Sequence, residues 1–551
     1  MEIHVDPLAV PGRRAPVFAR NGAVATSQPL AAQVGLAMLR SGGNAVDAAI
    51  ATAAALTVVE PCSNGIGSDA FALVWDGGRL HGLNGSGRAP ATSSAARLRD
   101  AGLAGMPATG WDSVTVPGAV RAWADLHARF GRLPFADVIE PAACVAEEGF
   151  TLSPVVAWAW DRTVRRVAGR TPNPATAGFL PHFAPAGSPI GVGGLWRSPE
   201  TAATLRAIAS SHGDDLYTGD LAERIVAFSA ATGGRLGAED LASHRSEWVD
   251  PISARYRDHE VWEIPPNGQG IAALIALRIL DGFDPQDVAP FGHAGGPVAP
   301  DAPANPAAWH HAIEAMKLAL ADTHAMVADP AVVDVPVAEL LGEGHIVTRR
   351  SVMGGRAGEP RPVDPRGSDT VYLAAADGEG QMVSFIQSNF AGFGSHIVIP
   401  GTGVSLQNRG WGFSLEPGHP NELAPRKRPF HTIIPGFLTQ GGHPVGPFGV
   451  MGGHMQAQGH VQVVLDTVDL RDDPQTALGR PRWFWDAEEQ RVDVETTAGQ
   501  EVLPGLAGLG HQVRMAPSRV TFGRGQAIWR TGNGTLVAAS EPRADGYPVG
   551  W

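Results

Sequence analysis

The feature that most constrains the fold is a helix without a polar face. Residues Ala45–Val59 are mainly alanine and other apolar residues. Gly42 and Gly43 end a preceding helical segment, and Asn44 is a favourable N-cap for the next one, with Asp47 in its first turn. A helix that is apolar all round has to be covered on every side. The pattern therefore predicts a buried helix inside a layered core.

The chain changes character near residue 367. Before it, helical patterns over residues 221–232 and 307–327 alternate with strands, including a β-hairpin formed by residues 70–75 and 80–83. After it, residues 370–376 and 383–388 predict a second hairpin, and short strands with glycine turns dominate. A chain of 551 residues is longer than one ordinary hydrophobic core absorbs. We therefore expect several layers or lobes.

Charge and composition exclude several classes of partner. The chain carries 42 basic and 55 acidic residues, a net charge of −13, which is unsuited to nucleic acid or anionic lipid. No window reaches the ~18 uninterrupted apolar residues of a membrane-spanning helix. The first 20 residues lack the apolar stretch of a signal peptide. These observations predict a cytoplasmic protein with no nucleic-acid or membrane partner.

The sequence contains no motif for a metal or a cofactor. It has no H-E-x-x-H, no G-x-S-x-G, no Walker loop and no G-x-G-x-x-G after a strand. His310, His311 and Glu314 share one helical region, where we interpret them as polar residues of a solvated face rather than as metal ligands. We expect neither a metal nor a cofactor.

A threonine at the start of the second hairpin is the first candidate for chemistry. Gly367, Ser368 and Asp369 precede Thr370. A threonine hydroxyl is a weak nucleophile unless a base lies beside it, but if the preceding bond is cut, the α-amine of Thr370, with a pKa near ~8, becomes that base. On these residues alone, an ordinary hairpin threonine remains the simpler interpretation.

A pair of adjacent glycines is the second candidate. Gly452 and Gly453 lie between an apolar strand over residues 447–450 and a helical pattern over 455–465. Two glycines at the start of a helix expose backbone N–H groups, which is what an oxyanion hole needs. Tight packing of a turn explains the pair equally well.

These segments, taken together, resemble the gamma-glutamyltranspeptidase family, also called glutathione hydrolases, of N-terminal nucleophile hydrolases. The resemblance covers roughly residues 20–551 and includes residues 31–35, 42–49, 116–118, 239–241, 314–317 and 540–543. It implies an α+β fold, a four-layer αββα sandwich in which two stacked sheets lie between helical layers.

The resemblance implies that Thr370 is the nucleophile and that the chain cleaves itself between Asp369 and Thr370. The products are residues 1–369 and 370–551, which share one core as a heterodimer of a large and a small subunit. Gly452 and Gly453 match the oxyanion diglycine of the family. The family's histidine two residues after the nucleophile is Tyr372 in this sequence.

The resemblance also implies a set of substrate-binding residues. His431 and Thr432 stand at a serine pair that binds the substrate's α-carboxylate, and Asn389 matches a substrate-binding asparagine, with Gln387 two residues before it. Arg409 stands at a glutamine of the family. The arginine that grips the α-carboxylate is Ser86 in this sequence, and the nearest candidate to replace it is Arg88.

One departure bears on the substrate. The aspartate that receives the substrate's α-ammonium in typical members is Gly412, and Arg409 adds positive charge nearby. Loss of such a partner costs ~2–5 kcal/mol of binding. A glutaryl-type acyl group, which has the carboxylate without the amine, is therefore favoured.

The sequence therefore predicts an autoprocessed threonine amidohydrolase or acyltransferase that cleaves γ-glutamyl or glutaryl-type amides through an acyl-enzyme. A cephalosporin acylase, which removes glutaryl side chains, is the alternative within the same class. An uncleaved, non-catalytic pseudoenzyme is the alternative of another class. The resemblance also allows a periplasmic location in place of the cytoplasmic one.

Overall fold

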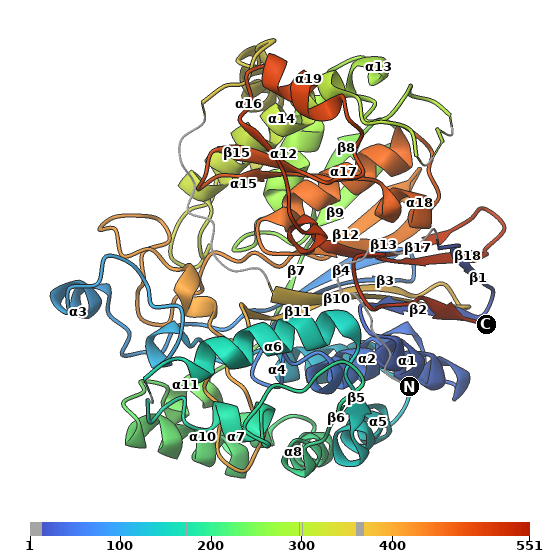
Figure 1. Cartoon of the computed structure of the whole chain (residues 1–551). Helices are drawn as coiled ribbons and strands as arrows, with labels where there is room; N and C mark the ends of the chain where they lie inside the picture. Colours follow the sequence, from blue (N-terminus) through green and yellow to red (C-terminus); the bar gives the residue numbers. More distant parts are fainter. Residues whose placement is uncertain (1–13, 172, 297, 300, 360–368) are drawn as a thin grey trace.

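The computed structural model describes residues 14–171, 173–296, 298–299, 301–359 and 369–551. Two seven-stranded sheets lie face to face, with one group of helices above them and another below (Figure 1). This arrangement is an α+β, four-layer αββα sandwich (Figure 1), so the predicted fold class is confirmed.

The lower sheet contains the strand of Thr370 near its centre. Its strands pair antiparallel in the order β19 (Val549–Gly550), β2 (Gly22–Thr26), β10 (Asp369–Asp377), β11 (Met382–Phe390), β3 (Asp69–Asp76), β4 (Arg79–Gly85) and β7 (Glu247–Val249). The two predicted hairpins are therefore present as β3–β4 and β10–β11.

The upper sheet is also antiparallel. Its order is β1 (Val17–Ala19), β18 (Leu536–Ser540), β17 (Arg524–Arg530), β13 (His443–Met451), β12 (Gly436–Gln440), β9 (His259–Glu263) and β8 (Ile252–Tyr256). Both large sheets thus combine strands from before and after residue 369. Two smaller sheets are formed by β5 (Phe150–Thr151) with β6 (Leu195–Trp196), and by β14 (Trp483–Asp486), β15 (Arg491–Val494) and β16 (Val513–Met515).

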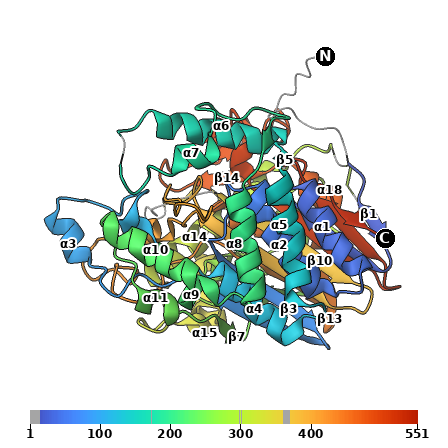
Figure 2. The same cartoon turned by 90° about the horizontal axis from the view of Figure 1, so that it is seen from below.

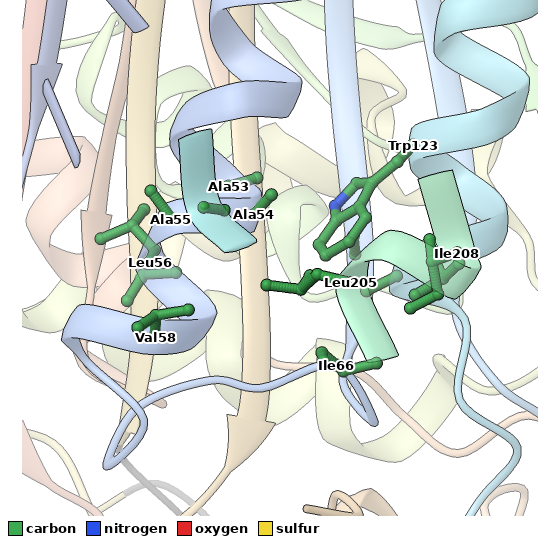
Figure 3. Packing of buried hydrophobic residues seen from close by; sticks show 14 of the residues in the cluster. Ala53, Ala54, Ala55, Leu56, Val58, Ile66, Trp123, Leu205 and Ile208 are labelled. Atoms are coloured by element: carbon green, nitrogen blue, oxygen red, sulfur yellow. The ribbon is translucent and has the colours of Figure 1, made fainter. Parts of the chain in front are cut away.

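The lower helical layer is built around the predicted buried helix, α2 (Ala45–Val59). Every residue of α2 is buried, and Asn44 and Asp47 form a reciprocal capping box at its start. Helix α1 (Pro29–Arg40) approaches α2 closely at Gly35, where an added Cβ would lie only 2.2 Å from the Thr52 hydroxyl. Alanines and Leu56 of α2 contribute to one hydrophobic cluster with Trp123, Leu205 and Ile208 from other helices (Figure 3).

Further helices complete the lower layer, seen from below in Figure 2. They are α1 (Pro29–Arg40), α4 (Ala119–Phe130), α5 (Phe135–Glu148), α6 (Pro154–Ala168), α7 (Phe179–Phe183), α8 (Pro199–Ser210), α9 (Asp215–Thr218), α10 (Asp220–Ala231) and α11 (Ala238–Ala242). Helix α3 (Ala95–Asp100) packs in a small separate cluster.

The upper helical layer covers the other sheet. It contains α12 (Gly270–Leu280), α13 (Pro285–Val288), α14 (Pro306–Met326), α15 (Val337–Leu340), α16 (Glu343–Ser351), α17 (Met455–Val468), α18 (Pro474–Gly479) and α19 (Val502–Gly508). The helical patterns expected over residues 307–327 and 455–465 correspond to α14 and α17. Within the described residues, no helix combines the length and the apolar character needed to cross a membrane.

A third core lies between the sheets. It joins side chains such as Phe71, Tyr372 and Ile386 of the lower sheet to Phe437 and Ile528 of the upper one. Because side chains alternate along a strand, every second residue of β10, β11 and β3 faces this core, and the residues between them face α2. This alternation decides which predicted site residues can meet.

Candidate active site

Thr370 lies at the head of β10 and faces the space between the sheets. Its side chain is on the same face as Tyr372, which belongs to the inter-sheet core. Thr370 is buried, and its hydroxyl donates a hydrogen bond to Ser388 Oγ at 3.1 Å. Ser388 Oγ in turn accepts a bond from the Phe390 backbone N–H at 2.8 Å. The candidate nucleophile is therefore oriented by the neighbouring strand.

A row of polar residues crosses the lower sheet from Thr370. Ser388 of β11 lies opposite Asp69, the first residue of β3, and the two side chains share the inter-sheet face. Ser86, the residue after the end of β4, continues the row beside Asp69, since Ala70 pairs with Gly85. The row places the Asp69 carboxylate one strand away from the Ser388 hydroxyl, to which Thr370 is hydrogen-bonded.

Asp69 is the centre of a buried charged cluster. Its Oδ2 accepts from His431 Nε2 at 2.6 Å and from Arg409 Nε at 3.2 Å, and its Oδ1 accepts from Arg409 Nη2 at 3.3 Å. All three side chains are fully buried. The structure therefore brings together two predicted substrate-binding residues, Arg409 and His431, through a carboxylate that the sequence analysis did not single out.

The pKa values in the cluster follow from burial and from the ion pair. Burial alone would raise the pKa of Asp69, but Arg409 and His431 outweigh it and hold that pKa below its usual value. Burial, reinforced by the Arg409 charge, lowers the pKa of His431 to about 4. A neutral His431 fits its contacts, because Nε2 donates to Asp69 and Nδ1 accepts from the Ile433 N–H. At neutral pH the cluster thus contains one positive and one negative charge.

Arg409 also links the cluster to Thr432. Its Nη1 donates to Thr432 Oγ1 at 2.9 Å, and its guanidinium carbon lies 4.4 Å from the centre of the Phe390 ring. Arginine has five N–H donors, and the bonds among the described residues use three of them. Arg409 therefore keeps donors for a further acceptor.

A glutamine joins this group to the diglycine. Gln269 Nε2 donates to the Thr432 carbonyl at 2.6 Å and to the Gly453 carbonyl at 2.9 Å. Gly452 and Gly453 have φ values of +136° and +60°, which favour glycine, in the turn between β13 and α17. The Gly452 carbonyl accepts from the Met455 N–H at the start of α17. Because N–H and C=O of a trans peptide point in opposite directions, the Gly453 N–H points away from the helix.

Two of the predicted substrate-binding residues lie on the other face of the sheet. Gln387 alternates with the inter-sheet residues of β11, and its amide bonds to Trp123 Nε1 at 2.9 Å and Asn64 Oδ1 at 2.7 Å. Asn389 Oδ1 accepts from Ser68 Oγ at 2.9 Å, on the same side. The structure does not bring these two side chains together with Thr370. Their hydrogen bonds connect β11 to the loop that follows α2.

Arg88 belongs to a separate ion cluster. Its guanidinium contacts Asp329 at 3.0 Å and Glu247 at 3.1 Å, and Arg428 contacts the other oxygen of Glu247 at 2.7 Å. About a third of the Arg88 side chain is exposed. The structure therefore places Arg88 in a network that reaches the surface, with one buried acidic partner, Asp329, and one exposed, Glu247.

One group of described residues has the composition of a metal site. Ligand atoms of His310, Glu314 and His511 lie within 4.8 Å of one another, and all three residues are buried. Lys317 Nζ already bonds to Glu314 Oε1 at 2.8 Å and contacts His511 Nδ1 at 3.4 Å, while His310 contacts His511 at 2.8 Å. The ammonium supplies the positive charge that a metal would bring, so these residues fit a self-contained network. The prediction that His310 and Glu314 lie on a solvated face is therefore wrong, because both are buried, and His311 lies outside the network.

Sequence reasoning missed Ser388, Asp69 and Gln269. Ser388 could have been found by alternation along its strand, which puts it on the Thr370 face in place of Gln387 and Asn389. Asp69 carries no motif, and the register that sets β3 against β11 is not local in the sequence. Gln269 precedes α12 and carries no motif.

Comparison with known proteins gives one family. Residues 31–551 match the family described as gamma-glutamyltranspeptidase. The chain is 36% identical over 533 residues to the glutathione hydrolase-like YwrD proenzyme of Bacillus subtilis, covering 95% of this chain and 97% of that protein. It is 32% identical over 549 residues to the acylase ACY 1 proenzyme of a Pseudomonas species, covering 97% of this chain and 94% of the relative.

A solved structure matches along the whole chain. The crystal structure of cephalosporin acylase from Bacillus halodurans superposes with a TM-score of 0.93 at 49% sequence identity, and the match covers 100% of this chain and 99% of that one.

Proposed function

The chain belongs to the gamma-glutamyltranspeptidase family, and we propose that it cleaves itself before Thr370 and then uses this residue as an N-terminal nucleophile. Its family and relatives make it a hydrolase or transferase that acts on amides. One observation carries the assignment of the nucleophile: the Thr370 hydroxyl is buried at the head of a central strand and bonded to Ser388 Oγ, one strand from the Asp69–Arg409 pair.

The proposed maturation uses the Thr370 hydroxyl on its own chain. Oγ1 attacks the carbonyl carbon of Asp369, the C–N bond to Thr370 breaks, and the nitrogen takes a proton to become the free α-amine. Water then hydrolyses the resulting ester. The fragments, residues 1–369 and 370–551, are proposed to stay together as a heterodimer, because both sheets contain strands from each of them. The proenzyme names of two relatives support this step.

The proposed turnover repeats the chemistry on an external amide. The α-amine of Thr370 accepts the hydroxyl proton as the oxygen attacks the substrate carbonyl, and the same proton is passed to the leaving amine. The N–H groups of Gly452 and Gly453 stabilise the oxyanion, and the acyl-enzyme is released to water or to an acceptor amine. The positive φ values of both glycines and the orientation of the Gly453 N–H support this role.

For the acyl group we propose γ-glutamyl and glutaryl-type amides. The names of two relatives, a glutathione hydrolase-like proenzyme and a cephalosporin acylase, support the two substrate classes. Arg409 and Thr432 are the proposed contacts for a carboxylate at the end of the acyl tail, because Arg409 has unused N–H donors next to the Thr432 hydroxyl. The sequence alone favoured a glutaryl tail, but the pairing of Arg409 with Asp69 returns a carboxylate to the site and weakens that preference.

Intact mass spectrometry of the purified protein tests the proposal. Wild-type protein is expected to give two fragments of the predicted masses, and Thr370→Ala to remain at full length. Thr370→Ser is the matched control, because it keeps the hydroxyl and should still cleave, more slowly. Two fragments from Thr370→Ala would overturn the assignment, and an uncleaved, inactive wild type would favour the pseudoenzyme alternative.

A further inference from the structure

Asp69 takes no part in the proposed bond-making steps, yet its carboxylate is the buried group that binds both Arg409 and His431. Three hydrogen bonds converge on it, and its side chain is fully buried. Its position on the row from Thr370 through Ser388 places it at the site rather than elsewhere in the core. The question is what a carboxylate does there.

The charges around Asp69 indicate what its carboxylate does in the site. Arg409 supplies one positive charge, and His431 is bonded as a neutral ring, so Asp69 brings the net charge of the cluster to zero. Without Asp69, a fully buried guanidinium would strongly attract any carboxylate that entered the site. With Asp69, a tail carboxylate gains the remaining Arg409 donors but is repelled by a like charge next to them.

We infer that Asp69 is a specificity-determining residue that acts through Arg409: it fixes the guanidinium and cancels its charge, so the site does not select acyl tails for negative charge. This inference rests on the proposed function and names the residue that sets its acyl preference. Asp69 is a positioning residue, because it acts on the substrate through Arg409.

A second buried ion pair, Arg480 with Asp472, serves as a comparison, because it lies outside the candidate site. Arg480 binds Asp472 through Nε at 2.8 Å and Nη2 at 3.1 Å, the same two-bond arrangement as Arg409 with Asp69. Both residues of that pair are buried, and they lie in the region of α18. Breaking either pair should lower stability, whereas only the Asp69 pair should change substrate choice.

The test compares three para-nitroanilides on the same enzyme sample: glutaryl, γ-glutamyl, and glutaric monoamide, in which a neutral amide replaces the tail carboxylate. The ratio of kcat/KM for glutaryl to that for the monoamide is independent of the fraction of active enzyme. Asp69→Asn is expected to raise this ratio by about 10- to 100-fold, mainly by lowering KM for the glutaryl compound. Asp472→Asn, the matched control, should leave the ratio unchanged.

Two further measurements keep the test decisive if Asp69→Asn does not mature. Arg409→Gln leaves the Asp69 charge alone in the site and should lower the same ratio by about tenfold or more. The wild-type ratio itself should lie within about tenfold of one. The inference would be overturned if Asp69→Asn changed kcat/KM by the same factor for the glutaryl and monoamide anilides, or lowered their ratio. A strong preference of the wild type for the glutaryl anilide would also overturn it. Turnover of none of the three anilides by the wild type would count against the proposed function itself.

Discussion

Ser388 Oγ accepts a hydrogen bond from Thr370 Oγ1 at 3.1 Å, across the pair of strands β10 and β11. The register of these strands shifts at this point: Asp369 pairs with Phe390, whereas Val371 pairs with Gln387. The register set by Val371 and Gln387 places Thr370 opposite Ser388, and their hydroxyls meet on the inter-sheet face just before the irregularity. In this way the backbone, and not a flexible loop, fixes the direction of the candidate nucleophile.

Replacing Ser388 by alanine should slow maturation without unfolding the protein. The Thr370 hydroxyl would lose its acceptor, and the Phe390 N–H would lose its partner. One neutral hydrogen bond is worth about 0.5–1.5 kcal/mol, which corresponds to roughly 2- to 12-fold in the cleavage rate. The measurement is a time course of fragment appearance on a denaturing gel. Ser384→Ala, on the same face but bonded to Tyr372, is the control and should cleave at the wild-type rate.

Gly452→Ala should reduce turnover more than stability. Its φ of +136° disfavours a side chain, and the new Cβ would lie 3.1 Å from Gly523 Cα, so the backbone has to shift. Alanine keeps the backbone N–H but displaces it, so if Gly452 supplies an oxyanion donor, kcat should fall by up to the ~10²–10³ of a lost donor. Gly442→Ala is the control: its φ of +80° also disfavours a side chain, its new Cβ would meet no other atom, and it lies away from the site. Equal loss of activity in both variants would argue against the oxyanion role.

The parts of the structure that local patterns determine were predictable, and those that depend on register were not. The composition of α2 required a buried helix, and alternation with glycine turns located both hairpins of the lower sheet. The chemistry of an N-terminal threonine made Thr370 a candidate, and only the family resemblance favoured it as the nucleophile, which stays a prediction. Asp69 could not be paired with Arg409, since 340 residues separate them. Gln387 and Asn389 were assigned by resemblance, although strand alternation turns both toward α2.

Lys317→Met should destabilise the protein strongly. Its ammonium bonds to the buried Glu314 carboxylate and to the Gly358 carbonyl. Removing one partner of a buried ion pair typically costs about 3–5 kcal/mol, because the remaining charge is left uncompensated. Chemical denaturation of wild type and variant measures this difference. The double variant Glu314→Gln/Lys317→Met removes both charges and should recover part of the loss; no recovery would mean that charge is not the cause.

Stability should fall as the pH drops below neutrality, and His244 should account for part of the loss. Burial, reinforced by Arg428 and other arginines, lowers the pKa of His244 to about 3. Between the usual pKa of ~6.5 and this value, the unfolded chain binds a proton that the folded protein does not, so folding loses free energy as the pH falls. From pH 7 to pH 5 this one residue should cost roughly 2 kcal/mol.

His244→Phe tests that assignment. Phenylalanine keeps an aromatic ring for the stack with Tyr217, whose ring centre is 5.6 Å away, but it cannot titrate. The difference in unfolding free energy between pH 7 and pH 5 should therefore shrink in the variant. An unchanged difference would show that His244 is protonated in the folded state as readily as in the unfolded one.

Arg88 and Arg409 give opposite expectations for substrate binding, although the sequence suggests both as binding residues. Arg88 is partly exposed and paired with the exposed Glu247 and the buried Asp329, so Arg88→Met should leave KM for glutaryl and γ-glutamyl anilides within about twofold of the wild type. The variant should lose stability, because the buried Asp329 carboxylate loses an ion-pair partner. Arg409→Met removes the buried donors next to Thr432, and KM for the glutaryl anilide should rise by about tenfold or more. Steady-state kinetics on matured enzyme decide between them. A large KM increase in Arg88→Met would place the tail carboxylate at the Arg88 network. An increase confined to Arg409→Met would instead place it near Thr370, at the row of polar side chains that crosses the lower sheet.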